Sequence, residues 1–433
     1  MNEIFERLIA DFHERALPSM TERAAVIPWL PGKVDTVVGM RRAGKTWFLY
    51  QVMKRLLDEG RAKESILYIN FEDERLLPIT SDDLSRITEV YFRLFPALKE
   101  TECAFFFDEI HTVPGWDRFV RRLVDTENLH ICLTGSSASL LSREIATSLR
   151  GRALSTEIFP FSFGESLVHA GIAVDSGRSP GSRLRARLSN HLRRYLLTGG
   201  FPEVQDLEEE YRIRVLQEYL DVVILRDVVE RHGISNTVAL RHLIRHLLGA
   251  PAGLFSVNRF YNDLRSRGIA VAKDTLHGYL DHLSDAYLFF QVPIHSASER
   301  RKQVNPRKVY AIDPGLVHAC SQSRSNNWGC VLETFVFLHL RRQWVDISYY
   351  LTGTGREIDF LVTDSTGSRS LIQVCAELAS ASTREREFAA LEQGMGETGI
   401  SEALVVTLDD EEVVQIPAGT IRIVPAWRWS GCC

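Results

Sequence analysis

Short apolar runs alternate with helical stretches in the first third of the chain, between Val34 and Thr134. The four runs are rich in β-branched and aromatic residues: VDTVVG (34–39), SILYINF (65–71), CAFFFDE (103–109) and HICLTGS (130–136). Short apolar runs separated by helical segments indicate a parallel sheet that is covered on both faces. Every run has a polar residue or glycine at or next to its end, at the sheet edge where ligands of such folds bind. We therefore predict an α/β domain whose chemistry lies at the carboxyl ends of its strands.

The remaining two thirds of the chain predict helices first and a second set of strands later. A run rich in Gly, Ser and Pro at 171–181 is typical of a linker or exposed loop, and an all-helical stretch follows at 182–248. Two amphipathic segments, 256–268 and 273–286, are joined by a short turn and followed by two β-like runs, YLFFQVPI and RKVYAID. This is the order of a winged helix-turn-helix. From about Asn326 onward, helical and strand patterns predict a second α/β domain.

Composition narrows the class of protein. The 433 residues exceed what one hydrophobic core usually holds, and 45% apolar with 25% charged residues is typical of a soluble globular protein. A net charge of −5 means that any contact with DNA has to be regional. The N-terminal segment lacks the apolar core of a signal peptide, and no apolar run is long enough for a membrane span. Seven cysteines without CxxC spacing predict reduced thiols, so we expect a cytoplasmic protein with no membrane partner.

The first strand leads into GMRRAGKT (39–46), which fits the pattern GxxxxGK[ST] and opens a helical segment. Glycines in such a turn let backbone N–H groups point at phosphates. We expect Lys45 to reach the β- and γ-phosphates of ATP and the Thr46 hydroxyl to ligate Mg²⁺. A chance glycine–lysine turn is the plain alternative, and the flanking strand and helix argue against it. The predicted cofactor-binding residues are Gly39, Met40, Arg41, Arg42, Ala43, Gly44, Lys45, Thr46, Trp47 and Asp108.

Two carboxylates, Asp108 and Glu109, end the third apolar run. A carboxylate pair at the end of a buried strand is costly unless a cation lies nearby. We predict that Asp108 holds Mg²⁺ through water and that Glu109 orients or deprotonates the attacking water. The alternative is a simple cap for the helix that follows.

Three further residues are candidates for the catalytic site. Ser136, after the fourth run, could hydrogen-bond the γ-phosphate or the attacking water, or could simply cap the next helix. Arg150 and Arg152 could neutralise charge on the γ-phosphate, in this subunit or in a neighbour. An ordinary solvated loop is the alternative for both arginines.

The motifs GMRRAGKT, FFFDEIHTVPGWDRFVRRL and LTGSSASLLSREIATSLRGRALSTEIFPFSFGE together resemble a widespread group of prokaryotic AAA+ ATPases fused to a C-terminal domain of unknown function. The likeness continues through LLTGGFPEV, VYAIDPGL and REIDFLV, so it spans nearly the whole chain. It implies an AAA+ core (1–170), a helical lid (171–250), a winged helix (251–325) and a domain similar to the PD-(D/E)XK nuclease fold (326–433). It also implies a homo-oligomeric ring, often a hexamer.

The nuclease resemblance places Glu333 at the acidic position of the first helix, Asp359 on the second strand and Gln373 on the third. Cys375 stands where such a nuclease has its lysine. A thiol with a pKa of about 8.5 cannot supply the positive charge of that lysine. We therefore expect a vestigial nuclease site without cleavage activity. An ATP-regulated nuclease is the alternative if Lys308 or another lysine enters the site.

Candidate DNA contacts lie in the predicted winged helix. One group lies at the start of its second helix, where recognition helices meet DNA. The other group forms the densest basic patch of the chain, where lysine and arginine would neutralise phosphates. The residues are Lys273, Thr275, His277, Arg300, Arg301, Lys302, Arg307 and Lys308. A solvated wing or a protein-docking module is the alternative. We expect an ATP-driven machine that acts on DNA in repair, recombination or defence, or else a nucleotide-dependent switch that docks a protein partner.

Overall fold

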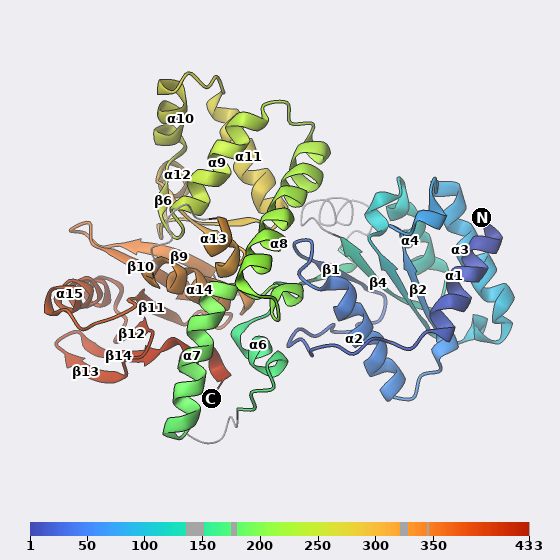
Figure 1. Ribbon diagram of the computed structural model, residues 1–433, viewed down its shortest axis with the longest axis horizontal. Helices are drawn as coiled ribbons and strands as arrows, with labels where there is room; N and C mark the ends of the chain where they lie inside the picture. Colours follow the sequence, from blue (N-terminus) through green and yellow to red (C-terminus); the bar gives the residue numbers. More distant parts are fainter. Residues whose placement is uncertain (136–150, 175–179, 321–327, 344–345, 433) are drawn as a thin grey trace. The chain divides into compact units, whose positions relative to one another are not determined.

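Figure 1 shows the computed structural model of the chain, which describes residues 1–135, 151–174, 180–320, 328–343 and 346–432. The chain divides into two compact units. Unit 1 comprises Met1–Phe159 with Asp285–Tyr287, and unit 2 comprises Pro160–Ser284 with Leu288–Cys433. No described helix has both the length and the apolar character that a membrane crossing requires.

Unit 1 is built on a parallel sheet of five strands in the order β2-β3-β4-β1-β5. The strands are β1 (Val34–Val38), β2 (Ile66–Asn70), β3 (Cys103–Asp108), β4 (Leu129–Gly135) and β5 (Ala153–Glu157). The parallel sheet predicted from the four apolar runs is confirmed. The same pattern does not predict β5, because its sequence ALSTE has the polar, partly exposed positions of an edge strand.

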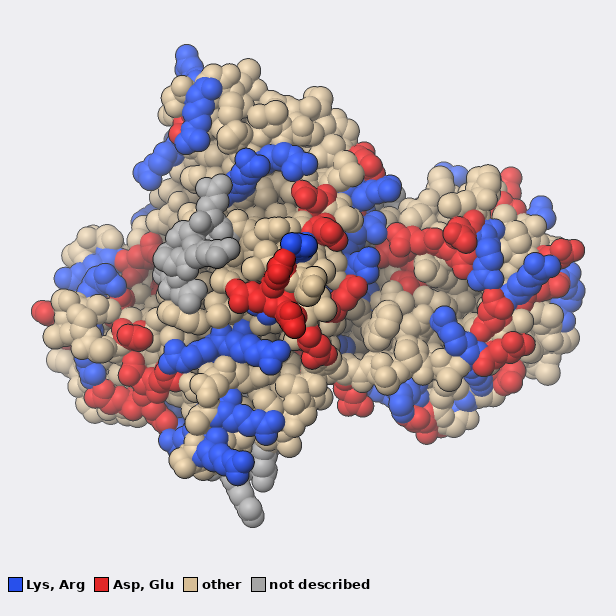
Figure 2. All heavy atoms as spheres, in the orientation of Figure 1, with Lys and Arg blue, Asp and Glu red and all other residues tan. Residues whose placement is uncertain are grey.

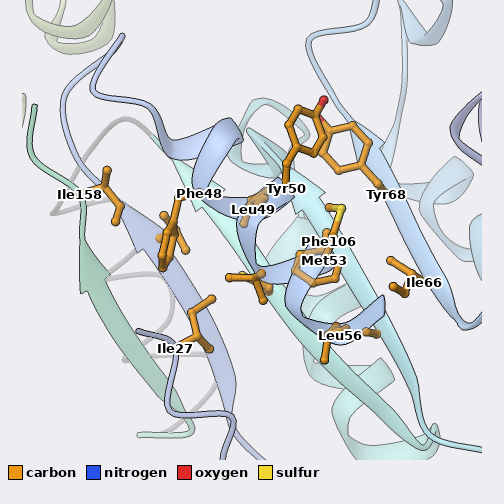
Figure 3. Packing of buried hydrophobic residues seen from close by; sticks show 14 of the residues in the cluster. Ile27, Phe48, Leu49, Tyr50, Met53, Leu56, Ile66, Tyr68, Phe106 and Ile158 are labelled. Atoms are coloured by element: carbon orange, nitrogen blue, oxygen red, sulfur yellow. The ribbon is translucent and has the colours of Figure 1, made fainter. Parts of the chain in front are cut away.

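Helices of unit 1 cover this sheet (Figure 1). They are α1 (Asn2–Glu14), α2 (Lys45–Asp58), α3 (Ser81–Leu94) and α4 (Trp116–Thr126). Three buried side chains of α2, Phe48, Met53 and Leu56, join Ile66 of β2 and Phe106 of β3 in one apolar cluster (Figure 3). Because this cluster fixes α2 against the strands, it also fixes the loop that precedes α2.

Unit 2 begins with helices, and all of these except the first start in the stretch 182–248 that the sequence predicts as helical. Its helices are α6 (Phe163–His169), α7 (Ser182–Thr198), α8 (Glu209–Val222), the π-helical segment η6 (Val223–Glu230) and α9 (Thr237–Gly249). A capping box starts α6, since the Ser162 hydroxyl accepts the Glu165 N–H while the Glu165 carboxylate accepts the Ser162 N–H. The predicted linker at 171–181 lies between the end of α6 and the start of α7.

A small antiparallel sheet with the order β6-β8-β7 follows the helices. In chain order its elements are β6 (Leu254–Phe255), α10 (Val257–Ser266), α11 (Lys273–Asp285), β7 (Phe289–Val292), α12 (Glu299–Val304), β8 (Arg307–Ala311) and α13 (Pro314–Cys320). Helix, turn, helix and strand thus occur in the predicted order. The two predicted strands do not follow each other directly, because α12 lies between them.

The C-terminal part of unit 2 contains a six-stranded mixed sheet with the order β13-β14-β12-β11-β10-β9. Its elements are α14 (Trp328–Arg342), β9 (Asp346–Leu351), β10 (Glu357–Thr363), β11 (Arg369–Val374), α15 (Ala381–Thr398), β12 (Glu402–Thr407), β13 (Glu412–Ile416), β14 (Gly419–Pro425) and η7 (Arg428–Cys432). Leu391 and Met395 of α15 pack with Ile358 of β10 and Leu371 of β11. The sequence pattern predicts an α/β domain here but not β13 and β14.

Candidate nucleotide-binding site

The loop between β1 and α2 has the backbone shape that phosphate binding needs. Gly39 has a φ of 149°, and a Cβ there would lie 2.1 Å from the carbonyl oxygen of Ile158. Gly44 has a φ of 99° and immediately precedes α2. The first N–H groups of α2 have no partner within the helix, so they are available to an anion held in the loop.

The Lys45 side chain lies across this loop. Its Nζ donates to the carbonyl oxygens of Gly39 at 3.1 Å and Met40 at 3.4 Å, and it lies 3.5 Å from Oε1 of Glu109. Lys45 is only 6% exposed. The phosphates of a nucleotide would give this buried ammonium further charged partners beside Glu109, in place of the two neutral carbonyls.

Asp108 ends β3 beside the same loop. Its Oδ2 accepts hydrogen bonds from Thr46 Oγ1 at 2.8 Å and Tyr68 Oη at 2.9 Å, and its Oδ1 accepts one from Thr134. Burial raises the pKa of Asp108, and the neighbouring charge of Glu109 raises it further. Across the part of the chain that the structure describes, this carboxylate has hydroxyl partners and no ion pair with lysine or arginine. A Mg²⁺ ion held by Thr46 and Asp108 fits a buried carboxylate in this situation.

Glu109 sits at the turn that follows β3. Its φ of 54° is uncommon for a residue with a side chain, and its N–H donates to Thr134 Oγ1 at 2.8 Å. The Glu109 carboxylate lies 3.3 Å from Nδ1 of His111. The Thr134 hydroxyl therefore connects the Asp108 carboxylate to the Glu109 backbone, so that β4 positions both acidic residues.

The structure thus brings Lys45, Thr46, Asp108 and Glu109 together at the carboxyl end of the parallel sheet. An ammonium, a hydroxyl and two carboxylates next to a row of backbone N–H groups can hold a triphosphate, a divalent cation and a water molecule. The arrangement is therefore suited to phosphoryl transfer from ATP to water.

Two supporting residues are not suggested by any sequence motif. Arg23 is buried and donates to Ala43 O at 3.0 Å and to Phe159 O, so it ties the phosphate loop to the segment after β5. Tyr68 on β2 holds the Asp108 carboxylate, and burial raises the pKa of its phenol, as does the charge of Asp108. Sequence patterns miss Arg23 because its partners lie 20 and 136 positions away.

Other residues predicted for this site have partners outside it, are exposed to solvent, or lie outside the described residues. Arg41 forms an ion pair with Glu72, with 3.1 Å between Nη1 and Oε1. Trp47 is 52% exposed. Arg152 forms an ion pair with Asp125, and both side chains are about half exposed. Ser136 and Arg150 lie outside the described residues.

The three residues predicted as a vestigial nuclease site, Glu333, Asp359 and Gln373, also converge. The Asp359 N–H donates to Gln373 Oε1 at 3.2 Å, and Glu333 and Asp359 both accept a hydrogen bond from Lys308. Burial raises the pKa of Glu333 and the charge of Asp359 raises it further, while the ammonium of Lys308 lowers it. Lys308 is only 2% exposed, so its prediction as a DNA contact is wrong: its ammonium is enclosed by carboxylates.

The remaining DNA candidates are on or near the surface of unit 2. Their side chains are exposed at Lys273, His277, Arg300 and Arg301 and half-buried at Thr275, Lys302 and Arg307. Lys302 pairs with Glu299 within α12, and Arg307 donates to Gln291 at 3.1 Å. The first four therefore remain the stronger candidates.

Comparison with known families agrees with this site. Residues 32–167 match the model of a family described as an AAA domain, and residues 189–327 and 328–429 match two domains of unknown function. The fold and the site therefore define a P-loop ATPase of the AAA class. The chain is 36% identical over 438 residues to the uncharacterized protein MJ1544 of Methanocaldococcus jannaschii, covering 99% of this chain and 95% of that protein. An uncharacterized protein of Haemophilus influenzae is 31% identical over 328 residues, covering 76% and 79%. The chain belongs to the family that these proteins represent.

Solved structures give a more distant likeness. Cdc6p from Pyrobaculum aerophilum is 12% identical, with 78% of this chain and 93% of that chain covered and a TM-score of 0.25. A chain of the Drosophila ORC bound to GC-rich DNA and Cdc6 is also 12% identical, with 73% and 91% covered and a TM-score of 0.22. TM-scores this low do not establish a shared overall arrangement, so nothing about partners follows from them.

Proposed function

We propose that the protein is a Mg²⁺-dependent ATPase that couples ATP hydrolysis to the binding and remodelling of DNA. The observation that carries the proposal is the convergence of Lys45, Thr46, Asp108 and Glu109 beside the glycine-bent loop. Hydrolysis needs a bound triphosphate and an activated water at one place, and this set provides groups for both.

Each residue has a separate part in the reaction. The loop N–H groups and Lys45 bind the β- and γ-phosphates and hold them in one orientation. Thr46 and Asp108 would hold Mg²⁺, which would supply positive charge to neutralise the phosphates. Glu109 accepts a hydrogen bond from the attacking water and takes up its proton, and Thr134 keeps Glu109 beside Asp108 during this step.

Support for DNA as the substrate comes from unit 2. Lys273 and His277 lie exposed at the start of α11, and Arg300 and Arg301 lie exposed on α12. Figure 2 shows that Lys and Arg side chains form local groups among acidic ones rather than one continuous basic field. A protein with a net charge of −5 would contact phosphates only through such regional groups.

The test is the rate of ATP hydrolysis in the presence of duplex, single-stranded and branched DNA. We expect at least one DNA form to stimulate hydrolysis several-fold at about 50 mM salt and much less at about 200 mM, because phosphate contacts release counterions. The triple variant Lys273→Ala/Arg300→Ala/Arg301→Ala should lose most of this stimulation and keep its basal ATPase rate.

A control variant removes the same charge elsewhere. Arg214, Arg226 and Arg241 are exposed but already paired with Glu or Asp, and their replacement by Ala should leave DNA stimulation intact. An equal loss in both triple variants would point to net charge alone. No stimulation by any nucleic acid would contradict the DNA proposal.

A second function, a nucleotide-dependent switch that docks a protein, is favoured by one observation. Val222 and Leu225 are 47% and 52% exposed around the start of η6, and Val238 on α9 is 57% exposed. Contiguous exposed apolar surface often marks a protein contact, and Val222 and Leu225 are three positions apart on one helical face. ATPase activity that ignores nucleic acid but changes on Leu225→Glu would favour this function.

A further inference from the structure

Lys308 of β8 carries a charge in a place where lysine is rarely found. Its side chain is 2% exposed, and its Nζ lies 2.8 Å from Glu333 Oε1, 2.7 Å from Glu357 Oε1 and 2.7 Å from Asp359 Oδ1. Each of the three N–H donors of the ammonium therefore has its own carboxylate. Burying an ammonium without such partners would be strongly unfavourable.

The carboxylates come from two elements of the C-terminal domain, whereas the ammonium comes from a strand that precedes this domain in the sequence. Glu333 lies on α14 and the other two acids lie on β10, in the six-stranded sheet. Lys308 belongs to the three-stranded sheet, and Tyr310 of the same strand donates to Glu333 at 2.7 Å. One strand of the small sheet thus completes a cluster in the large one.

Two further polar groups of the cluster are already engaged. Asp359 Oδ2 accepts the Val374 N–H at 2.8 Å, and Gln373 donates through Nε2 to Glu387 at 2.7 Å. A divalent cation would have to contact the same carboxylate oxygens at about 2.0–2.6 Å, next to the ammonium that now occupies their centre. Two cations at that separation would repel each other strongly in a buried site.

We propose that Lys308 is the resident cation of this cluster, so that its ammonium takes the place of a divalent metal and joins β8 to the C-terminal sheet. The wild-type cluster then binds no divalent cation. Removing the ammonium leaves three carboxylates with a shared centre, so a variant without Lys308 gains a divalent-cation site made of Glu333, Glu357 and Asp359.

The test measures Mn²⁺ binding to the full chain without nucleotide, from the free Mn²⁺ signal in electron paramagnetic resonance. All proteins carry Asp108→Asn, which removes the metal ligand of the nucleotide site. We expect Lys308→Met to bind one Mn²⁺ per chain at least tenfold more tightly than the Lys308 protein does. Adding Asp359→Asn to Lys308→Met should abolish this binding.

The two arms of the test are independent. A protein with Lys308 in place that binds Mn²⁺, and loses it on Asp359→Asn, would overturn the proposal and favour a metal-dependent nuclease. A folded Lys308→Met protein, judged by circular dichroism, that gains no Mn²⁺ site would overturn it as well. If Lys308→Met does not fold, the comparison made with Lys308 in place decides. Mn²⁺ binding to that protein which Asp359→Asn leaves unchanged would support a cluster already filled by the ammonium.

Discussion

A single hydroxyl group, that of Thr134, holds both acidic residues of the nucleotide site. It donates to Asp108 and accepts from the Glu109 N–H. Thr134→Val should lower kcat for ATP roughly tenfold or more, since Glu109 loses its fixed position, whereas ATP affinity should change less than about threefold. Steady-state hydrolysis and equilibrium binding of a fluorescent ATP analogue measure the two quantities.

Thr36 of β1 provides the matched control. It is also fully buried in the parallel sheet, but its hydroxyl faces β5, 3.2 Å from Leu154 O and 2.8 Å from Ser155 Oγ. Thr36→Val should therefore leave kcat unchanged. A loss of the same size in both variants would show that sheet packing, and not the bridge to Glu109, controls the rate.

His339 on α14 should make the free energy of unfolding depend on pH. Burial lowers its pKa to about 4, with the charge of Arg342 as the second cause. In the unfolded chain its pKa is about 6.5. Between these values the unfolded chain binds a proton that the folded chain does not, so the free energy of unfolding falls as pH is lowered from 6.5 to 4. The loss is at most on the order of 3 kcal/mol.

Urea denaturation at pH 7 and pH 4.5 checks this expectation. His339→Gln should lose less stability than the wild type over that range. His277→Gln, which changes an exposed histidine of α11, should lose as much as the wild type does. Parallel behaviour of the wild type and His339→Gln would contradict the assignment.

Helix α15 contains two glycines with opposite surroundings. A Cβ on Gly394 would lie 2.4 Å from Ile358 Cδ1, whereas a Cβ on Gly396 would meet nothing within 4 Å. Gly394→Ala should destabilise unit 2 by about 1–2 kcal/mol through overpacking against β10. Gly396→Ala should stabilise it by about 0.5–1 kcal/mol, because alanine favours the helix. Effects of the same sign in urea denaturation would show that α15 does not pack on β10 as described.

The sequence predicts elements that carry a strong local pattern. Buried strands such as β3, with its run of phenylalanines, are visible as apolar runs, and the loop 39–46 has a recognisable motif. Edge strands such as β5 and β13 are short and partly exposed and contain polar residues, so they lack a continuous apolar run. Contacts between distant segments leave no local pattern. The sequence therefore offers Lys308 both as a DNA contact and as a lysine that enters the site of Glu333 and Asp359, and only the structure decides for the second.

The buried carboxylate of Asp313 shows how motifs far apart in the chain depend on one another. Asp313 accepts the N–H groups of Gly200 at 2.6 Å and Leu316 at 3.0 Å. A Cβ on Gly315 would lie 2.1 Å from Thr198 O. The runs LLTGGFPEV and VYAIDPGL therefore meet inside unit 2, as do β8 and β10 at Lys308. Unit 2 is thus connected by polar contacts as well as by its apolar cores.

The homo-oligomeric ring that the family resemblance implies makes a prediction for the assembled molecule. If subunits hydrolyse ATP in cooperation, Glu109→Gln subunits mixed with wild-type subunits should lower the ATPase rate more than dilution does. The reason is that one inactive subunit would slow its neighbours. A rate that falls linearly with the inactive fraction would show that subunits act independently, and mass photometry with ATP would give the subunit number.

The most direct test of the whole proposal is ATP binding and hydrolysis by Glu109→Gln, with Lys45→Ala measured beside it. Glu109→Gln should bind ATP with Mg²⁺ as the wild type does and hydrolyse it at least a hundredfold more slowly. The reason is that a general base typically raises the rate by about 10²–10⁴-fold. Lys45→Ala should lose ATP binding or turnover. Hydrolysis by Glu109→Gln at the wild-type rate would contradict the role given to this carboxylate and, with it, the site described at the end of the parallel sheet.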